Sequence, residues 1–69
     1  MSSFGARLKD ERRARGWTVP TLSRRSGVPV STLYEIEKGR VPREHTRMRI
    51  AKVFGLELAE IDDWDSVAA

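Results

Sequence analysis

The chain has 69 residues, a length that suits one domain, and it contains no cysteine, which excludes a disulfide framework and a thiolate metal site. No apolar run approaches the roughly 20 residues that a spanning helix needs, and no segment resembles a secretory signal peptide. We therefore expect a cytoplasmic protein of modest stability, because a chain this small buries only about 60% of the surface that its unfolded form exposes.

The formal net charge of +3 conceals an asymmetry along the chain. All thirteen lysines and arginines lie between Arg7 and Lys52, a segment with five acidic residues and a formal charge of +8. From Val53 onward the chain has five acidic residues and no base, which gives −5. This separation indicates one surface that meets a polyanion and another that does not, with solvated arginine-rich helices as the plainer alternative.

A first helix is expected to begin at Phe4, capped by one of the two serines before it, and to end at Gly16. Its helical spacing places Phe4 and Leu8 on an apolar face and charged residues on the opposite face. Trp17 follows, and we expect it to pack in the core against the next helix rather than to stack on a ligand.

The stretch Thr18–Arg40 predicts two short helices joined by a tight turn. Its first residue is suited to the N-cap of a helix over Val19–Ser26, which tolerates a proline in its first turn. Gly27 supplies the turn, and a second helix follows over about Val30–Lys38. Two short helices joined by a glycine-containing turn form a helix-turn-helix unit, here over about residues 18–39.

Beyond a basic, proline-containing loop, a helix is expected over Thr46–Phe54. A final acidic helix is expected over about residues 57–65, with Leu58, Ile61 and Trp64 on its apolar side. The last four residues of the chain are expected to fray.

No arrangement typical of catalysis or metal binding is found, so no enzyme activity, metal or cofactor is expected. The sequence offers no nucleophile–base arrangement, no phosphate loop and no carboxylate pair with a catalytic role. His45 has no second histidine, cysteine or acidic cluster at ligand spacing, which favours a surface or capping position.

These elements together resemble the lambda-repressor/Cro-type, or Xre-like, helix-turn-helix family. The matching residues are FGARLKDERRARGWT from Phe4, then Leu22, Gly27, Val28, STLYEIEKG from Ser31, Pro42, Ile50–Val53 and FGL from Phe54. The resemblance covers about residues 4–61. It implies an all-α fold, a compact bundle of five short helices in a single domain over residues 1–69, with the helix-turn-helix formed by the second and third.

The resemblance also implies roles for single residues. Arg12 and Glu37 match a pair that bridges the first and third helices in family members, so a partly buried ion pair is expected. The third helix is expected to lie in the DNA major groove. The positions that meet base edges there are Val30, Ser31 and Glu35, with Tyr34 adjacent.

These base-reading candidates lack the side-chain types that discriminate most strongly among bases. The strongest discriminating pairs join arginine to guanine, or glutamine or asparagine to adenine, and this helix offers none of them. Val19 also stands where many family members have a glutamine, and Pro29 where they often have a polar cap. Specificity is therefore expected to be modest or to depend on DNA shape. Affinity is expected to come from phosphate contacts, whose candidates are Lys38, Arg40, Arg43, Arg24 and Arg25.

The expected function is a sequence-specific transcriptional regulator of the small repressor or controller type, associated with the nucleoid. It would bind double-stranded DNA at a palindromic operator as a homodimer. Leu58, Ile61 and Trp64 are candidates for the dimer interface, and Trp64 could equally cap the monomer core. The alternative is a protein–protein interaction module or antitoxin component with the same fold, favoured by the weak base-reading chemistry.

Overall fold

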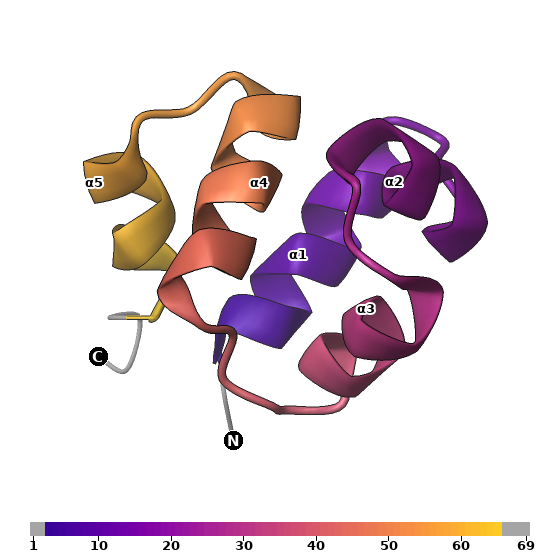
Figure 1. Ribbon diagram of the computed structural model, residues 1–69, viewed down its shortest axis with the longest axis horizontal. Helices are drawn as coiled ribbons and strands as arrows, with labels where there is room; N and C mark the ends of the chain where they lie inside the picture. Colours follow the sequence, from indigo (N-terminus) through magenta and orange to yellow (C-terminus); the bar gives the residue numbers. More distant parts are fainter. Residues whose placement is uncertain (1–2, 66–69) are drawn as a thin grey trace.

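The structure is a computed structural model that describes residues 3–65. It contains α1 (Ser3–Ala14), α2 (Val19–Ser26), α3 (Val30–Glu37), α4 (Glu44–Phe54), α5 (Leu58–Asp62) and the 3-10 helix η1 (Asp63–Asp65). No strand occurs within residues 3–65, and none of their helices is long and apolar enough to cross a membrane. The predicted all-α bundle is confirmed, with α1 at its centre between the α2–α3 pair and the α4–α5 pair (Figure 1). The expected fraying of residues 66–69 lies outside the described residues.

The predicted helix-turn-helix is held by its own hydrogen bonds. The Thr18 hydroxyl accepts from the Thr21 N–H at 3.2 Å and so caps α2, as expected. Gly27 ends α2 with φ 80°, a left-handed conformation that glycine adopts without strain. The Ser26 hydroxyl then accepts from the Val28 N–H at 3.2 Å, which fixes the chain as it enters α3.

The ends of α1 and α3 share one local motif, in which the third residue past the helix donates a backbone hydrogen bond to a carbonyl of its last turn. Trp17 N–H donates to the Arg12 carbonyl at 3.1 Å, and Arg40 N–H donates to the Glu35 carbonyl at 3.0 Å. The chain before each donor turns at a glycine with positive φ, and α4 ends in the same way. The loops therefore leave these helices in fixed directions.

Two predicted boundaries need correction. The helix expected from Thr46 begins earlier, at Glu44, because Arg47 N–H already donates to the Arg43 carbonyl at 2.9 Å. The final acidic helix expected over residues 57–65 is divided into α5 and the 3-10 helix η1.

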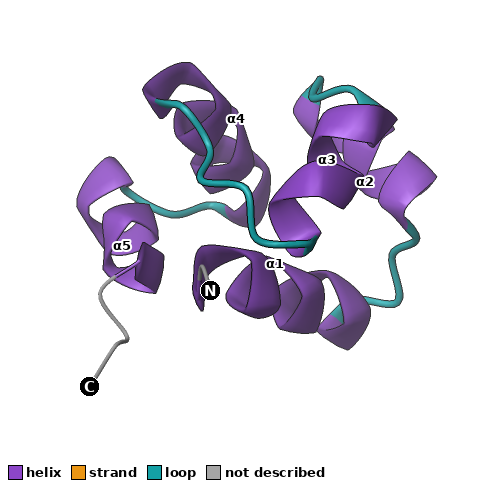
Figure 2. Ribbon diagram, turned by 90° about the horizontal axis from the view of Figure 1, so that it is seen from below, coloured by secondary structure: helices purple, strands orange, loops and turns teal. Residues whose placement is uncertain are grey.

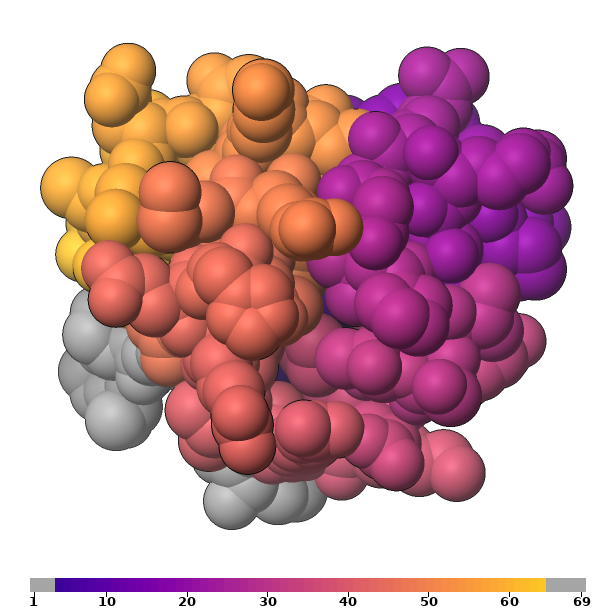
Figure 3. All heavy atoms as spheres, in the orientation of Figure 1, coloured from indigo at the N-terminus to yellow at the C-terminus, as the bar shows by residue number. Residues whose placement is uncertain are grey.

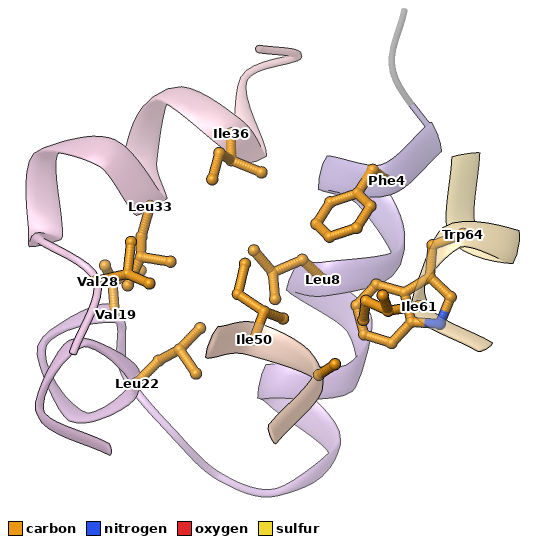
Figure 4. Close-up of a cluster of buried hydrophobic side chains, with 11 residues drawn as sticks. Phe4, Leu8, Val19, Leu22, Val28, Leu33, Ile36, Ile50, Ile61 and Trp64 are labelled. Atoms are coloured by element: carbon orange, nitrogen blue, oxygen red, sulfur yellow. The ribbon is translucent and has the colours of Figure 1, made fainter. Parts of the chain in front are cut away.

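The core draws one or two side chains from every α-helix (Figure 4). The largest fully buried side chains are Phe4, Leu8, Leu22, Leu33, Ile36, Ile50 and Ile61. Two of these belong to α3, which is only eight residues long. The rotation of α3 about its axis is therefore fixed by packing, and so is the direction of its outer face.

The C-terminal aromatic residue belongs to this core. Trp64 is 3% exposed, and its ring centroid lies 5.3 Å from that of Phe4 and 5.7 Å from that of Phe54. Ile61 is fully buried beside it. The monomer already covers both side chains, which is the core-capping alternative for Trp64, so a dimer interface that uses Ile61 and Trp64 stays a prediction that would require them to become exposed. Of the three candidates, only Leu58 keeps part of its surface accessible.

Trp17 is partly buried against the core, as expected, and it contacts α4 as well as the next helix, α2. Its ring stacks on Phe54 of α4, with centroids 5.7 Å apart and an angle of 24° between the planes. The guanidinium of Arg25, from the last turn of α2, lies 4.8 Å from the Trp17 ring. Trp17 thus joins α2 to α4.

Gly5 lies at a close approach of α1 to α3. A Cβ atom at this position would lie 2.1 Å from the carbonyl oxygen of Ile36 and 3.1 Å from the Cα of Glu37. Both contacts are with backbone atoms, which cannot move aside as a flexible side chain can. The absence of a side chain at Gly5 therefore sets the distance between the two helices.

Candidate nucleic-acid interface

The outer face of α3 is the most direct candidate for contact with DNA. Leu33 and Ile36 point into the core, and this packing turns Ser31, Tyr34 and Glu35 toward solvent. Tyr34 is 48% exposed, so both its ring and its hydroxyl are accessible. We refer to Ser31, Tyr34 and Glu35 as the reading face.

Val30, the fourth base-reading candidate, is only partly accessible. Its side chain is packed against the core cluster and is therefore less available than the reading face to meet a thymine methyl group. Pro29 precedes it at the N-cap with φ −57° and ψ 145°, and contributes no side-chain cap. The polar cap that the resemblance favours at this position is thus replaced by a residue that only sets the backbone direction.

The expected ion pair between α1 and α3 is present and has two parallel hydrogen bonds. Arg12 Nε donates to Glu37 Oε2 at 2.8 Å, and a terminal guanidinium nitrogen donates to Oε1 at 3.0 Å. The two side chains are 11% and 8% exposed. The bonds to Glu37 raise the pKa of Arg12 further above its ordinary value. Arg12 also donates to the Trp17 carbonyl at 2.8 Å. Its side chain therefore binds both Glu37 of α3 and the loop that follows α1.

A second ion pair, between Glu35 and Arg40, was not expected from the sequence. Glu35 is on the reading face and Arg40 was a phosphate candidate, but the two side chains are paired with each other. The hydrogen bond from Arg40 N–H to the Glu35 carbonyl places the two residues side by side at the end of α3. The separation of five residues hides this contact from a search for helical i, i+4 pairs.

The loop that joins α3 to α4 is drawn in teal in Figure 2, and its sequence contains the other basic residues of this region. Lys38 and Arg43 are exposed, as a phosphate contact requires. A hollow of about 360 Å³ lies between α3 and the start of α4, lined by Pro29, Thr32, Ile36, Arg40, Pro42, Arg43, His45 and Thr46. His45 is exposed at its rim, which confirms the expected surface position.

The two arginines of α2 are placed differently from the loop residues. Arg24 donates to the Thr21 hydroxyl at 3.4 Å, and Arg25 lies over Trp17. Arg25 also lines a groove between α2 and α4 that no α3 residue lines. The structure therefore groups Lys38, Arg40 and Arg43 around α3 and separates Arg25 from them.

Two arginines of α4 have roles that the sequence did not reveal. Arg49 donates to the Gly27 carbonyl at 3.0 Å and so holds the turn of the helix-turn-helix against α4. Arg47 donates to the Pro42 carbonyl and to Asp62 Oδ1, both at 3.2 Å. No local sequence signal predicts either bond, because each depends on how α4 packs on distant segments.

The described part of the chain contains no group of three histidine, cysteine or acidic side chains that could hold a metal ion. Its buried side-chain nitrogen and oxygen atoms all have hydrogen-bond partners.

A five-helix bundle whose second and third helices meet at a glycine turn, with the third helix exposed along one face, defines a helix-turn-helix domain. Comparison with protein-family models matches residues 3–64 to a family described as "Helix-turn-helix domain". The chain therefore belongs to this helix-turn-helix family. Searches of curated proteins and of solved structures returned no match.

Proposed function

We propose that this chain is a sequence-specific DNA-binding transcriptional regulator of the small repressor or controller type. The observation that carries the proposal is the reading face of α3, held outward by two buried side chains and bordered by the exposed cations Lys38 and Arg43. An α-helix fits the major groove of B-DNA, and hydroxyl, phenol and carboxylate groups can all meet base edges or phosphates there.

The proposed affinity comes from phosphate neutralisation. Lys38 and Arg43 are exposed beside α3 and form no ion pair within residues 3–65, so both are available to phosphates. Each neutralised phosphate releases counterions, which makes binding depend steeply on salt. This electrostatic contribution is independent of sequence, and the reading face supplies the preference.

We also propose a homodimer on a palindromic operator, acting at the nucleoid in the cytoplasm. Dimeric helix-turn-helix proteins place two recognition helices about 34–36 Å apart. The longest extent of this chain is 31 Å, a size compatible with two copies side by side on successive major grooves. Since Ile61 and Trp64 are covered in the monomer, the interface would have to expose them or use other surface, of which Leu58 is one half-buried candidate.

A double substitution, Lys38→Ala with Arg43→Ala, tests the proposed phosphate contacts. The slope of log affinity against log salt should become shallower by about 1.8, because each lost contact removes about 0.9. Fluorescence anisotropy with a random duplex, and with the DNA upstream of the protein's own gene, would measure the slope.

Its matched control is Lys9→Ala with Arg13→Ala, which removes the same charge from α1 and should change the slope less. If the unsubstituted chain binds neither duplex at low salt, the proposal is wrong.

Glu35→Gln tests how Glu35 acts. Because Glu35 is paired with Arg40, we expect this change to release Arg40 to phosphates and to raise affinity for all duplexes about fivefold, or ~1 kcal/mol. Arg40→Gln should abolish that gain when the two changes are combined. Ser31 and Tyr34 would then supply the preference among sequences, whereas a changed preference without a uniform gain would assign Glu35 to base reading as well.

A protein-interaction module remains the second candidate, and one observation favours it. Tyr34, Val41 and Met48 are large hydrophobic side chains that are 48%, 61% and 53% exposed. Tyrosine and methionine are among the residue types that are enriched at protein–protein interfaces. Duplex binding that falls with salt would favour the regulator, and its absence would favour this module or an antitoxin component.

A further inference from the structure

A basic groove lies between α2 and α4, away from the reading face. It has a volume of about 480 Å³ and is lined by Arg25, Ser26, Arg49, Lys52 and Val53. Three of these five residues are cations, one carries a hydroxyl and none is acidic. We call this site the α2/α4 groove. Figure 3 shows the furrow where orange α4 meets the α2–α3 unit.

Contacts with uncharged groups hold two of the three cations in place. Arg49 donates one of its five N–H groups to the Gly27 carbonyl, and four N–H groups remain for a ligand. The guanidinium of Arg25 rests on the Trp17 ring at 4.8 Å. Lys52 follows Arg49 by three residues on α4, which places both on one side of that helix. Because the arginines are positioned in advance, little side-chain entropy is lost when a ligand binds.

The charge of the α2/α4 groove is left uncompensated by the protein. No ion pair within residues 3–65 involves Arg25, Arg49 or Lys52. The exposed acidic residues of the C-terminal segment lie on α5 and its flanks, on the other side of α4 (Figure 1). Three neighbouring cations repel one another, so a ligand with several negative charges is the one that such a groove favours.

The α2/α4 groove continues toward the loop after α3. A smaller hollow, of about 240 Å³, shares Arg49 with it and shares Pro29, His45 and Thr46 with the hollow beside α3. These three hollows follow the outer side of α4, whose eleven residues span about 16 Å. Cations recur along this path, and regularly spaced phosphates are the anions that match such a row.

We propose that the α2/α4 groove is a second binding site for a nucleic-acid phosphate backbone, distinct from the α3 reading face. Its side chains offer charge and hydroxyl groups, which bind phosphates and read no bases. The backbone it holds belongs either to flanking DNA of the same duplex or to a second duplex, and these two sources share the same chemistry. The site does not depend on the proposed role of α3.

The test removes two cations and leaves Arg49 to hold the turn. Arg25→Gln with Lys52→Gln is compared with Lys9→Gln with Arg13→Gln, which lowers the net charge equally on α1. Thermal unfolding first establishes that both variants are folded. One arm measures binding to a single duplex of about 40 base pairs, far longer than the 31 Å chain at 3.4 Å per base pair. The other arm measures capture of a second, labelled duplex by protein on an immobilised one.

Loss of two phosphate contacts should reduce the salt slope by about 1.8, so that between 50 and 200 mM salt the parent chain loses about 12-fold more affinity than the groove variant. If the groove variant binds the single duplex more weakly than the parent chain does, the ligand is flanking DNA. If only its capture of the second duplex is weaker, the ligand is a second duplex. Groove and control variants that behave alike in both arms would overturn the proposal. So would a groove variant that loses only self-association, since the groove would then meet the acidic α5 of another copy.

The variant Lys38→Ala with Arg43→Ala, run in parallel, separates the two proposals. If it binds like the parent chain while the groove variant binds poorly, the α2/α4 groove stands and the proposed role of α3 fails. The reverse pattern overturns the groove and leaves α3 in place.

Discussion

Gly5→Ala is expected to lower the free energy of unfolding by about 3 kcal/mol, although alanine is the better helix former. The intrinsic preference alone would stabilise α1 by roughly 1 kcal/mol. The added methyl group, however, would lie 2.1 Å from the Ile36 carbonyl oxygen, and relieving that overlap requires α1 and α3 to separate. Overpacking of this kind typically costs about 1–3 kcal/mol, and here the obstacle is backbone.

Urea unfolding monitored by circular dichroism would measure the change. A chain of this length has a total stability of roughly 3–10 kcal/mol, so the variant should lose a large part of it. Ala6→Gly, at an exposed position of the same helix, serves as the control and should cost about 1 kcal/mol or less. A Gly5→Ala variant more stable than the parent would show that the two helices are not in close contact.

Arg12→Ala should cost about 3 kcal/mol, because it leaves the Glu37 carboxylate largely buried without its cation. Glu37→Ala should cost a similar amount for the converse reason. Replacing both with apolar residues, Arg12→Met with Glu37→Leu, should cost less than either single change, since no unpaired charge then remains. Urea unfolding of the parent chain and the three variants would measure these differences.

The exposed ion pairs of Glu11 provide the contrast. Glu11 is paired with Arg7 at 2.8 Å and with Arg15 at 2.9 Å on the surface of α1. Glu11→Gln should cost only a few tenths of a kcal/mol per pair. If the free energy of unfolding of the Arg12 and Glu37 variants fell by no more than this, the pair would contribute no more to stability than an exposed ion pair.

Much of the fold could be predicted because its signals are local. Glycines at helix ends, the Thr18 cap and the apolar spacing of Leu33 and Ile36 each depend on a few neighbouring residues. The Arg12–Glu37 pair spans 25 residues and was expected only from the family resemblance. The burial of Ile61 and Trp64 depends on how the C-terminal segment packs on α1, and no local sequence pattern specifies that packing.

The candidate site was predictable in outline and less so in its electrostatics. The sequence indicated that Ser31, Tyr34 and Glu35 would face outward, and they do. It could not indicate that Arg40 turns back to Glu35, because that contact depends on the geometry of the helix end. For the same reason Arg49 had no predicted role until α4 was placed beside the Gly27 turn.

The fixed helix ends have a consequence for the DNA. Hydrogen bonds hold the residues that follow α1, α3 and α4, so these helices have little freedom to change their directions on a duplex. Where the curvature or groove width of the duplex does not match the protein surface, the nucleic acid would then have to deform. The energy of that deformation depends on its sequence. Flexible pyrimidine–purine steps would be favoured at positions that no side chain touches. A chain with so plain a reading face could thus select its site through the mechanics of DNA.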